Sequence, residues 1–162
     1  MFENIIKNVH NRHPLIHCIT NYVSINDCAN IVLACGGAPI MAEDINEVSQ
    51  ITSICQGLDI NIGMLNDNKL SSMLKAGATA NELGIPVILD PVGAGSSDYR
   101  IKAVQNLMSN VQFGVIRGNV SEIKAIAAKQ GIHNIAAGVY ETMQKNKSAM
   151  GLSLIHISEP TR

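Results

Sequence analysis

The sequence predicts a single α/β domain in which helices cover a mostly parallel sheet. Short apolar runs alternate several times with segments of helical periodicity, and a glycine ends most of the helical segments. Residues 87–89 form a continuous apolar run, as parallel strands buried on both faces do. The length of 162 residues is enough for one domain with a hydrophobic core of its own.

The composition indicates a globular protein and excludes several classes. With 46% hydrophobic and 15% charged residues, the chain is not intrinsically disordered. No apolar run approaches the ~20 residues of a membrane span, and the N-terminus lacks the pattern of a signal peptide. A net charge of −1 without tryptophan argues against a nucleic-acid partner. We therefore expect a cytoplasmic protein that acts on a small molecule, with its four cysteines reduced and packed in the core.

The first half of the chain is predicted to contain three helices and three strands in alternation. Pro14 ends the first helix, Ser24 or Asn26 caps the second, and Asp44 caps the third. The inward-facing residues expected on the third helix are Ile45, Val48, Ile51 and Ile54. The predicted elements are a helix at 1–13, a strand at 15–19, a helix from 24–26 to 35, a strand end or loop at 38–41, a helix from 44 to Gly57 and a strand at 58–63.

The second half continues the alternation. Asn66 or Asp67 starts a helix that Gly84 ends. A strand at 85–89, a helix around 101–108, a strand at 111–116 and a helix at 121–129 follow. From residue 132 this rhythm weakens. We assign residues 1–150 to one domain and expect residues 151–162, which fit no element, to be a non-native or read-through tail.

The segment at residues 88–97, I-L-D-P-V-G-A-G-S-S, has the form of a strand end that carries a ligand. Asp90 stands at the end of the strand, and Pro91 cannot continue the hydrogen-bond ladder because it lacks an N–H. Gly93 and Gly95 allow the backbone to approach a ligand closely or to adopt a positive φ. Tight strand-to-helix turns also carry glycines where no ligand binds, so this segment alone leaves both interpretations open.

Polar residues also follow other predicted strands, and the carboxyl ends of parallel strands share one crevice. Arg117 can pair with phosphate oxygens, while Asp90 and Glu122 can hold Mg²⁺ directly or through water. Asn119 can cap the helix that follows and leave N–H groups near an anion. Together with Asn61, these residue types suit phosphoryl transfer. Two plainer interpretations stay open: Glu122 as a capping-box acid and Arg117 as a solvated loop charge.

Five motifs in a fixed order carry a family resemblance. They are T-N-Y-V-S-I-N-D-C-A-N at residues 20–30, G-G-A-P-I-M-A at 36–42, N-I-G-M-L at 61–65, L-D-P-V-G-A-G at 89–95 and R-G-N-V-S-E-I at 117–123. In these motifs, and across about residues 1–130, the chain resembles hydroxyethylthiazole kinase, a thiamine-salvage enzyme of the ribokinase-like superfamily. The resemblance implies a ribokinase-like fold that is incomplete at its C-terminus.

The same resemblance implies a function. It implies an ATP-dependent kinase that phosphorylates the hydroxyl of 4-methyl-5-(2-hydroxyethyl)thiazole, with Mg²⁺ as cofactor and a homotrimer as the assembly. By carry-over, Met41 and Asn21 belong to the thiazole pocket. The remaining residues implied are Arg117, Asn119, Gly93 and Gly95 for ATP, and Asp90 and Glu122 for Mg²⁺.

Members of the family continue well past the end of this chain. The part beyond it is expected to supply a Gly-rich anion hole, the residue in the place of the catalytic base, and most of the nucleotide pocket, so no catalytic residue is assigned within the chain. We therefore expect little or no kinase activity from the chain alone. Two alternatives remain open: a non-catalytic thiazole-binding module, and another ribokinase-like kinase that acts on a vitamin precursor.

Overall fold

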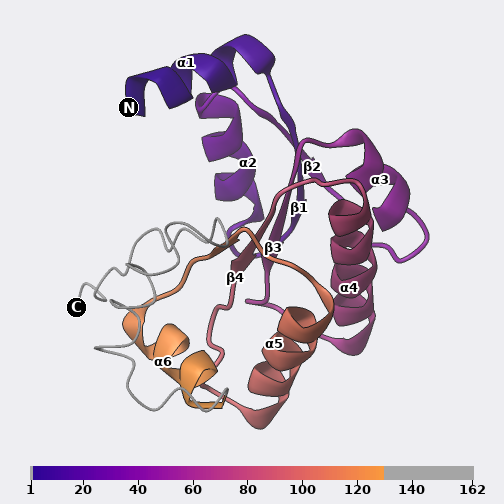
Figure 1. Cartoon of the computed structure of the whole chain (residues 1–162), viewed down its shortest axis with the longest axis vertical. Coiled ribbons are helices and arrows are strands. Elements are labelled where there is room, and N and C mark those ends of the chain that lie inside the picture. The colour runs from indigo at the N-terminus through magenta and orange to yellow at the C-terminus, as the bar shows by residue number, and fades with distance from the viewer. Residues whose placement is uncertain (1, 130–162) are drawn as a thin grey trace.

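A parallel sheet of five strands organises the protein, whose computed structural model describes residues 2–129 (Figure 1). The strands are β1 (Leu15–Ile19), β2 (Ala38–Met41), β3 (Gly57–Asn61), β4 (Val87–Asp90) and β5 (Val115–Ile116). They stand in the order β2-β1-β3-β4-β5, and every neighbouring pair is parallel. The predicted α/β class is confirmed, whereas this strand order was not predictable from the sequence.

Six helices accompany the strands in the described part of the chain. They are α1 (Phe2–Arg12), α2 (Ile25–Ala34), α3 (Val48–Ile54), α4 (Asp67–Glu82), α5 (Asp98–Asn110) and α6 (Val120–Lys129). Figure 1 shows α3 and α4 on one side of the strands and α1 and α2 on the other. Helix α5 packs against α4, and α6 packs against α5. The sheet therefore has helices on both faces, as a parallel sheet requires.

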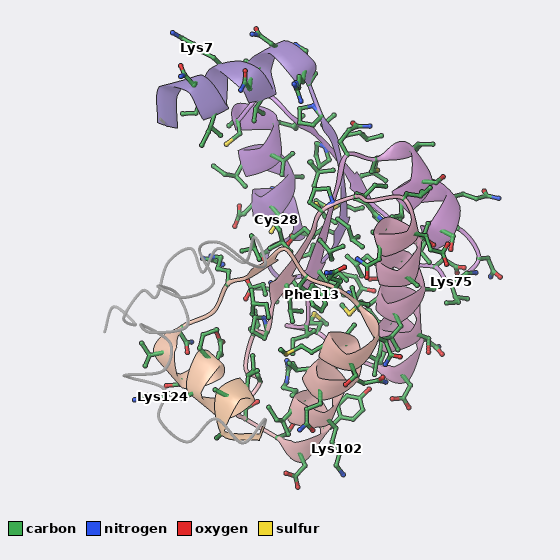
Figure 2. The ribbon with its side chains drawn as sticks, viewed as in Figure 1. Lys7, Cys28, Lys75, Lys102, Phe113 and Lys124 are labelled. Carbon is green, nitrogen blue, oxygen red and sulfur yellow. The ribbon has the colours of Figure 1, made fainter. Side chains whose placement is uncertain are left out.

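The hydrophobic core lies where α4 and α5 pack against β3 and β4. Ile60 and Leu89 from the strands are fully buried together with Met73 and Val104 from the helices. Phe113, in the connection from α5 to β5, joins this cluster and lies near the centre of the molecule in Figure 2. Burial of each large apolar side chain contributes about 1.5–3 kcal/mol, so this cluster fixes how the strands, and therefore their carboxyl ends, stand relative to one another.

Most element boundaries agree with the predictions. Strand β1 has the predicted bounds, and residues 38–41 form β2. Asn66 caps α4, because its Oδ1 accepts the N–H of Lys69 at 2.9 Å. Ser24 occupies the N-cap position of α2, but its side chain makes no capping bond. Its N–H and its hydroxyl donate instead to Oδ1 of Asn21.

The third helix begins later than predicted. Asp44 does not cap it, since α3 starts at Val48 with Glu47 in the N-cap position. Oδ1 of Asp44 accepts the N–H of Asn46 at 2.8 Å. An aspartate that accepts the N–H of the residue two positions ahead stabilises a non-helical turn. Here that turn precedes the helix, so α3 starts at Val48 instead of directly after Asp44.

The predicted inward face of this helix is only partly correct. Val48 is fully buried and Ile51 is half-buried, as the helical spacing predicts. Ile45 and Ile54, also predicted to face inward, are 39% and 57% exposed. Because the helix starts at Val48, Ile45 lies before it in the turn, and the buried face runs instead from Val48 to Thr52.

Three strands differ from their predicted bounds. The runs at 58–63, 85–89 and 111–116 become Gly57–Asn61, Val87–Asp90 and Val115–Ile116. Gly57 does not end α3, because Cys55 is its C-cap and Gly57 is the first residue of β3. Val111 and Phe113 are buried without belonging to a strand. These two apolar residues therefore indicate burial and not strand pairing. A short apolar run by itself does not distinguish these two cases.

His17 joins β1 to two other segments from inside the protein. The side chain is fully buried, with Nε2 at 2.8 Å from the carbonyl oxygen of Ala42 and Nδ1 at 2.9 Å from Oγ1 of Thr52. The carbonyl can only accept, so Nε2 carries the proton and Nδ1 accepts the hydroxyl of Thr52. Burial lowers the pKa of His17, although the Ala42 carbonyl and the charge of Glu47 oppose this effect.

We expect His17 to make the fold sensitive to acid. Because its pKa in the folded state lies below the ordinary value of 6.5, the unfolded chain takes up the proton first. The stability contributed by neutral His17 is complete above pH 6.5 and is lost as the pH falls through the folded-state pKa. In thermal melts, His17→Gln is expected to lose less stability than the parent chain when the pH is lowered below 6.5. An equal loss in both proteins would contradict this assignment.

The remaining predictions about the chain have mixed outcomes. All four cysteines are free thiols, and Cys18 and Cys55 are buried as expected, but Cys35 is exposed and does not pack in the core. Within residues 2–129, none of the helices combines the length and the apolar character needed to cross a bilayer. The weaker rhythm from residue 132 and the predicted tail at 151–162 lie outside the described residues.

Candidate functional site

The predicted site residues lie along one edge of the sheet. Met41, Asn61 and Asp90 are the last residues of β2, β3 and β4. Asn21 follows β1, and Arg117 follows β5. The strand order therefore places them at this edge in the order Met41, Asn21, Asn61, Asp90 and Arg117, although they are far apart in the sequence. The predicted crevice at the carboxyl ends of the strands is where such a sheet binds ligands.

Four of these side chains form a continuous row of hydrogen bonds. Asn21 Nδ2 donates to Asn61 Oδ1 at 3.2 Å, and Asn61 Nδ2 donates to Asp90 Oδ2 at 3.1 Å. Arg117 Nη1 pairs with the same Asp90 oxygen at 3.1 Å. Met41 lies at the same edge, with β1 between its strand and β3, and is half-buried. The row crosses the sheet from the end of β1 to the end of β5.

Asp90 is the electrostatic centre of this row. Burial raises its pKa; the nearby charge of Arg117 lowers it, and the charge of Glu122 raises it further. Its Oδ2 is occupied by Asn61 and Arg117, whereas Oδ1 accepts no hydrogen bond from residues 2–129. The side chain of Arg117 is 61% exposed, so the guanidinium has donors left for an incoming anion. The plainer interpretation of Arg117, a solvated loop charge, agrees with this exposure but does not account for its ion pair with Asp90.

Glu122 is held between two loops by backbone N–H groups. Its Oε2 accepts the N–H of Asn119 at 2.8 Å, while Asn119 Oδ1 accepts the N–H of Glu122 at 2.9 Å. These reciprocal bonds are a capping box at the start of α6, which confirms that interpretation. In addition, Oε1 accepts the N–H of Gly93 at 2.9 Å. Gly93 has a φ of +67°, a conformation that glycine adopts without strain, so the 91–95 loop can turn its N–H toward Glu122.

A pocket lies beside this contact. Its volume is about 610 Å³, and its walls come from the loop after β4 and the first turns of α6. The lining residues are Gly93, Gly95, Ser96, Asn119, Ser121, Glu122, Lys124 and Ala125. Three residues predicted to bind ATP, Gly93, Gly95 and Asn119, thus share one cavity with Glu122. No cluster of three or more His, Cys, Asp or Glu side chains suited to a metal ion occurs within residues 2–129.

We expect Glu122→Ala to destabilise the protein, because it removes the capping box and the tether to Gly93. The expected loss is about 1 kcal/mol of unfolding free energy, measured by urea denaturation. Ser121→Ala is the matched control, since Ser121 is exposed on the same turn. Equal stabilities of the two variants would show that the carboxylate of Glu122 does not hold the loop.

A buried lysine near the row was not predicted. Lys69 lies in the first turn of α4 with its side chain 3% exposed. Its ammonium pairs with Glu43 at 2.7 Å, donates to the carbonyl of Thr20 and lies 4.5 Å from the centre of the Tyr22 ring. Tyr22 in turn donates its hydroxyl to Glu43. Lys69 therefore joins the loops that follow β1 and β2. The one available signal was a cation at the positive end of a helix, where the dipole disfavours it.

Comparisons with known proteins agree with this geometry. The family model described as "Hydroxyethylthiazole kinase family" matches residues 6–155. Among curated proteins, a hydroxyethylthiazole kinase of Clostridium acetobutylicum is 61% identical over 132 residues, which cover 82% of this chain and 48% of the relative. One from Alkaliphilus metalliredigens is 59% identical over 124 residues, which cover 76% of this chain and 46% of the relative.

A solved structure shows the same fold. The hydroxyethylthiazole kinase protein of Pyrococcus horikoshii OT3 superposes with a TM-score of 0.81 at 33% identity. The superposition covers 94% of this chain and 59% of that one. The chain thus spans about half the length of the curated relatives it matches.

Proposed function

The chain belongs to the hydroxyethylthiazole kinase family, and on that basis we propose that the whole protein phosphorylates the hydroxyl of 4-methyl-5-(2-hydroxyethyl)thiazole with ATP in thiamine salvage. The hydrogen-bonded row Asn21–Asn61–Asp90–Arg117 is the observation that carries this proposal. It joins the proposed alcohol pocket at one end to the proposed phosphate region at the other. Phosphoryl transfer depends on holding the two reactants in line, which such a row can support.

On the nucleotide side, we assign phosphate contacts to Arg117 and to the pocket that Gly93, Gly95 and Asn119 line. The exposed guanidinium of Arg117 can exchange part of its bond with Asp90 for bonds to phosphate oxygens, which it matches in charge and geometry. The N–H groups at the start of α6 add a favourable dipole for an anion in the same pocket.

Among the described residues, the site offers Mg²⁺ one available carboxylate oxygen, that of Asp90. Mg²⁺ usually binds one or two carboxylates, keeps several waters and takes its other ligands from the phosphates. Oδ1 of Asp90 is available for that role, whereas both oxygens of Glu122 already accept backbone N–H groups. We therefore propose Asp90 as the carboxylate that holds the ion and Glu122 as a residue that acts on it through water. Bound there, the ion would neutralise charge on the phosphates.

On the alcohol side, we propose that Asn21 and Met41 contact the thiazole. Asn21 has its amide held by Asn61 and Ser24, so its orientation is fixed before substrate arrives. Met41 offers an apolar, adaptable surface for the ring. The half-buried position of both side chains leaves them within reach of a small molecule.

We also propose a cytoplasmic homotrimer. Helix α2 is apolar, yet none of its ten residues is buried in the described structure. Ile31 and Leu33 on it are 62% and 56% exposed, and Val23 just before it is 88% exposed. Apolar side chains exposed at these positions favour burial against another surface, and we propose a second copy of the protein as that surface. Sedimentation of the purified protein at several concentrations tests the assembly, and a monomer throughout would contradict it.

The function is best tested in a fused protein. Residues 1–129 of this chain are joined to the remaining half of the Clostridium acetobutylicum relative, and ADP formation is followed with and without the thiazole alcohol. We expect thiazole-dependent turnover that requires Mg²⁺. Asn21→Ala is expected to raise KM for the thiazole by about tenfold, which corresponds to about 1.4 kcal/mol. Asn68→Ala, at an exposed asparagine of α4, is the matched control.

Each other outcome of this assay has a definite meaning. Thiazole binding without ADP formation in a folded protein would favour the non-catalytic binding module. Faster turnover of a pyrimidine or of pyridoxal would favour another ribokinase-like kinase. The unfused 162-residue chain is expected to show little or no turnover in the same assay, and activity near that of the fused protein would contradict that expectation.

A further inference from the structure

Arg100 connects the loops that follow β3 and β4. Its Nη1 donates to the carbonyl oxygens of Ile62 at 2.6 Å and Val92 at 2.9 Å. Its Nη2 donates to the carbonyl oxygen of Gly63 at 2.8 Å. The two loops follow neighbouring strands, β3 and β4. Among the described residues, one backbone hydrogen bond beyond the strand ladder links the end of β4 to the first loop: the Ile62 N–H donates to the Asp90 carbonyl at 3.2 Å.

The position of Arg100 is unfavourable for the helix that carries it. Arg100 lies in the first turn of α5, near the positive end of the helix dipole, where a cation is disfavoured. Within residues 2–129 it has no carboxylate partner, and its half-buried guanidinium is matched only by carbonyl oxygens. A residue that violates a local rule in this way is expected where it serves a site, and planar arginine donors suit several fixed acceptors at once.

Both loops carry residues of the proposed site. Asn61 ends β3 directly before Ile62, and its Oδ1 accepts the N–H of Gly63 at 2.8 Å. Asp90 ends β4 two residues before Val92, and Gly93 follows it. Arg100 therefore sets how far the Asn61 side of the row stands from the Asp90 side.

We propose that Arg100 is a positioning residue that fixes the spacing between the loop at 61–65 and the loop at 91–95. It touches neither the reacting atoms nor the proposed ligands, and its effect passes through the carbonyls it binds. The consequence for ligand binding rests on the proposed function, because it assumes that Mg·ATP occupies the site beside Asp90. The effect on the loops themselves does not depend on that assumption.

The test uses the 162-residue chain with Arg100→Met and Arg100→Lys. Lys102→Met is the matched control, since Lys102 lies two residues further along α5 and points outward in Figure 2. Amide hydrogen exchange is measured residue by residue in this chain. Mg·ATP binding is measured by calorimetry in the fused protein described above, with the same substitutions. We expect the amides of Ile62, Gly63 and Gly93 to exchange about tenfold faster in Arg100→Met, with Leu58 and Leu89 unchanged. Arg100→Lys is expected to recover part of this protection, because one ammonium can reach fewer of the three carbonyls.

Mg·ATP affinity is expected to fall about tenfold in Arg100→Met and to stay unchanged in Lys102→Met. Unchanged loop exchange would overturn the proposal, and so would faster exchange spread evenly over loops and strands, which would indicate a general loss of stability. Faster loop exchange with unchanged Mg·ATP affinity would overturn the consequence for the site. If the fused protein without substitutions does not bind Mg·ATP, the proposed function fails, and the exchange data alone decide the role of Arg100.

Discussion

Asp59→Asn is expected to stabilise the protein by about 2 to 3 kcal/mol at pH 7. Asp59 lies in the middle of β3, next to Cys18 on one side and Ile88 on the other. The pKa of its carboxyl is raised from 3.8 to about 6, because burial and, to a smaller extent, the charge of Asp90 raise it more than the charge of Arg117 lowers it. At neutral pH the native protein therefore holds a charge that its surroundings disfavour, and asparagine removes that charge at almost constant volume.

The stabilising effect of Asp59→Asn is expected to depend on pH. Because the folded-state pKa is raised, the native protein binds the proton more tightly than the unfolded chain does. The stability that Asp59 contributes is complete below pH 3.8 and is lost as the pH rises through about 6. The advantage of Asp59→Asn should therefore be largest at pH 7 and absent below pH 3.8.

Urea denaturation at a series of pH values measures this difference directly. Asp98→Asn provides the control, because Asp98 is an exposed carboxylate in the first turn of α5. A control variant that gained as much stability as Asp59→Asn would mean that net charge, and not the position of Asp59, is responsible. A stability advantage of Asp59→Asn that did not change with pH would contradict the raised pKa.

Gly77→Ala is expected to destabilise the protein by about 2 kcal/mol, although alanine is the better helix former. Gly77 is buried in the middle of α4. A Cβ atom at this position would lie 2.5 Å from Cγ2 and 2.7 Å from Cγ1 of Val111, which is itself buried at the end of α5. The added methyl group would force α4 and the end of α5 apart, and strain in a packed core exceeds the gain of about 1 kcal/mol in helix propensity.

A double-mutant cycle with Val111→Ala isolates this contact. Val111→Ala alone should be destabilising, because it leaves a cavity against α4. In the double variant the new methyl group of residue 77 fills part of that cavity. The stability loss of the double variant should therefore be smaller than the sum of the two single losses, by about 1 kcal/mol or more. The three variants are compared by urea denaturation, with unchanged m-values as a check. If the two single losses simply add in the double variant, contact with Val111 is not the reason why residue 77 must be glycine.

Much of the candidate site could be predicted because its residues sit at the ends of strands. Asp90 and Arg117 follow apolar runs, so the alternation of strands and helices is sufficient to place both at one edge of the sheet. Asn61 entered the prediction only as a residue type that could meet the others. The structure makes it the link between Asn21 and Asp90, through bonds of 3.2 and 3.1 Å.

Other residues could not be predicted because their partners are distant in the sequence. Arg100 binds carbonyls up to 38 residues away, and Lys69 binds a carbonyl 49 residues away. Neither contact leaves a periodic pattern, since each depends on how two loops stand after the sheet has formed. Glu122 illustrates the intermediate case. Its capping box is local and can be predicted from the sequence as an alternative, whereas its bond to Gly93, 29 residues away, requires the fold.

The sequence by itself determined the α/β class, the alternation of elements and the motifs that carry the family resemblance, because periodicity, capping and turn chemistry act over a few residues. It did not determine the order β2-β1-β3-β4-β5, the raised pKa of Asp59 or the role of Arg100. These depend on burial and on contacts between distant segments. Only when the apolar faces of β3 and β4 are packed against α4 and α5 do the polar strand ends come close enough to form one site.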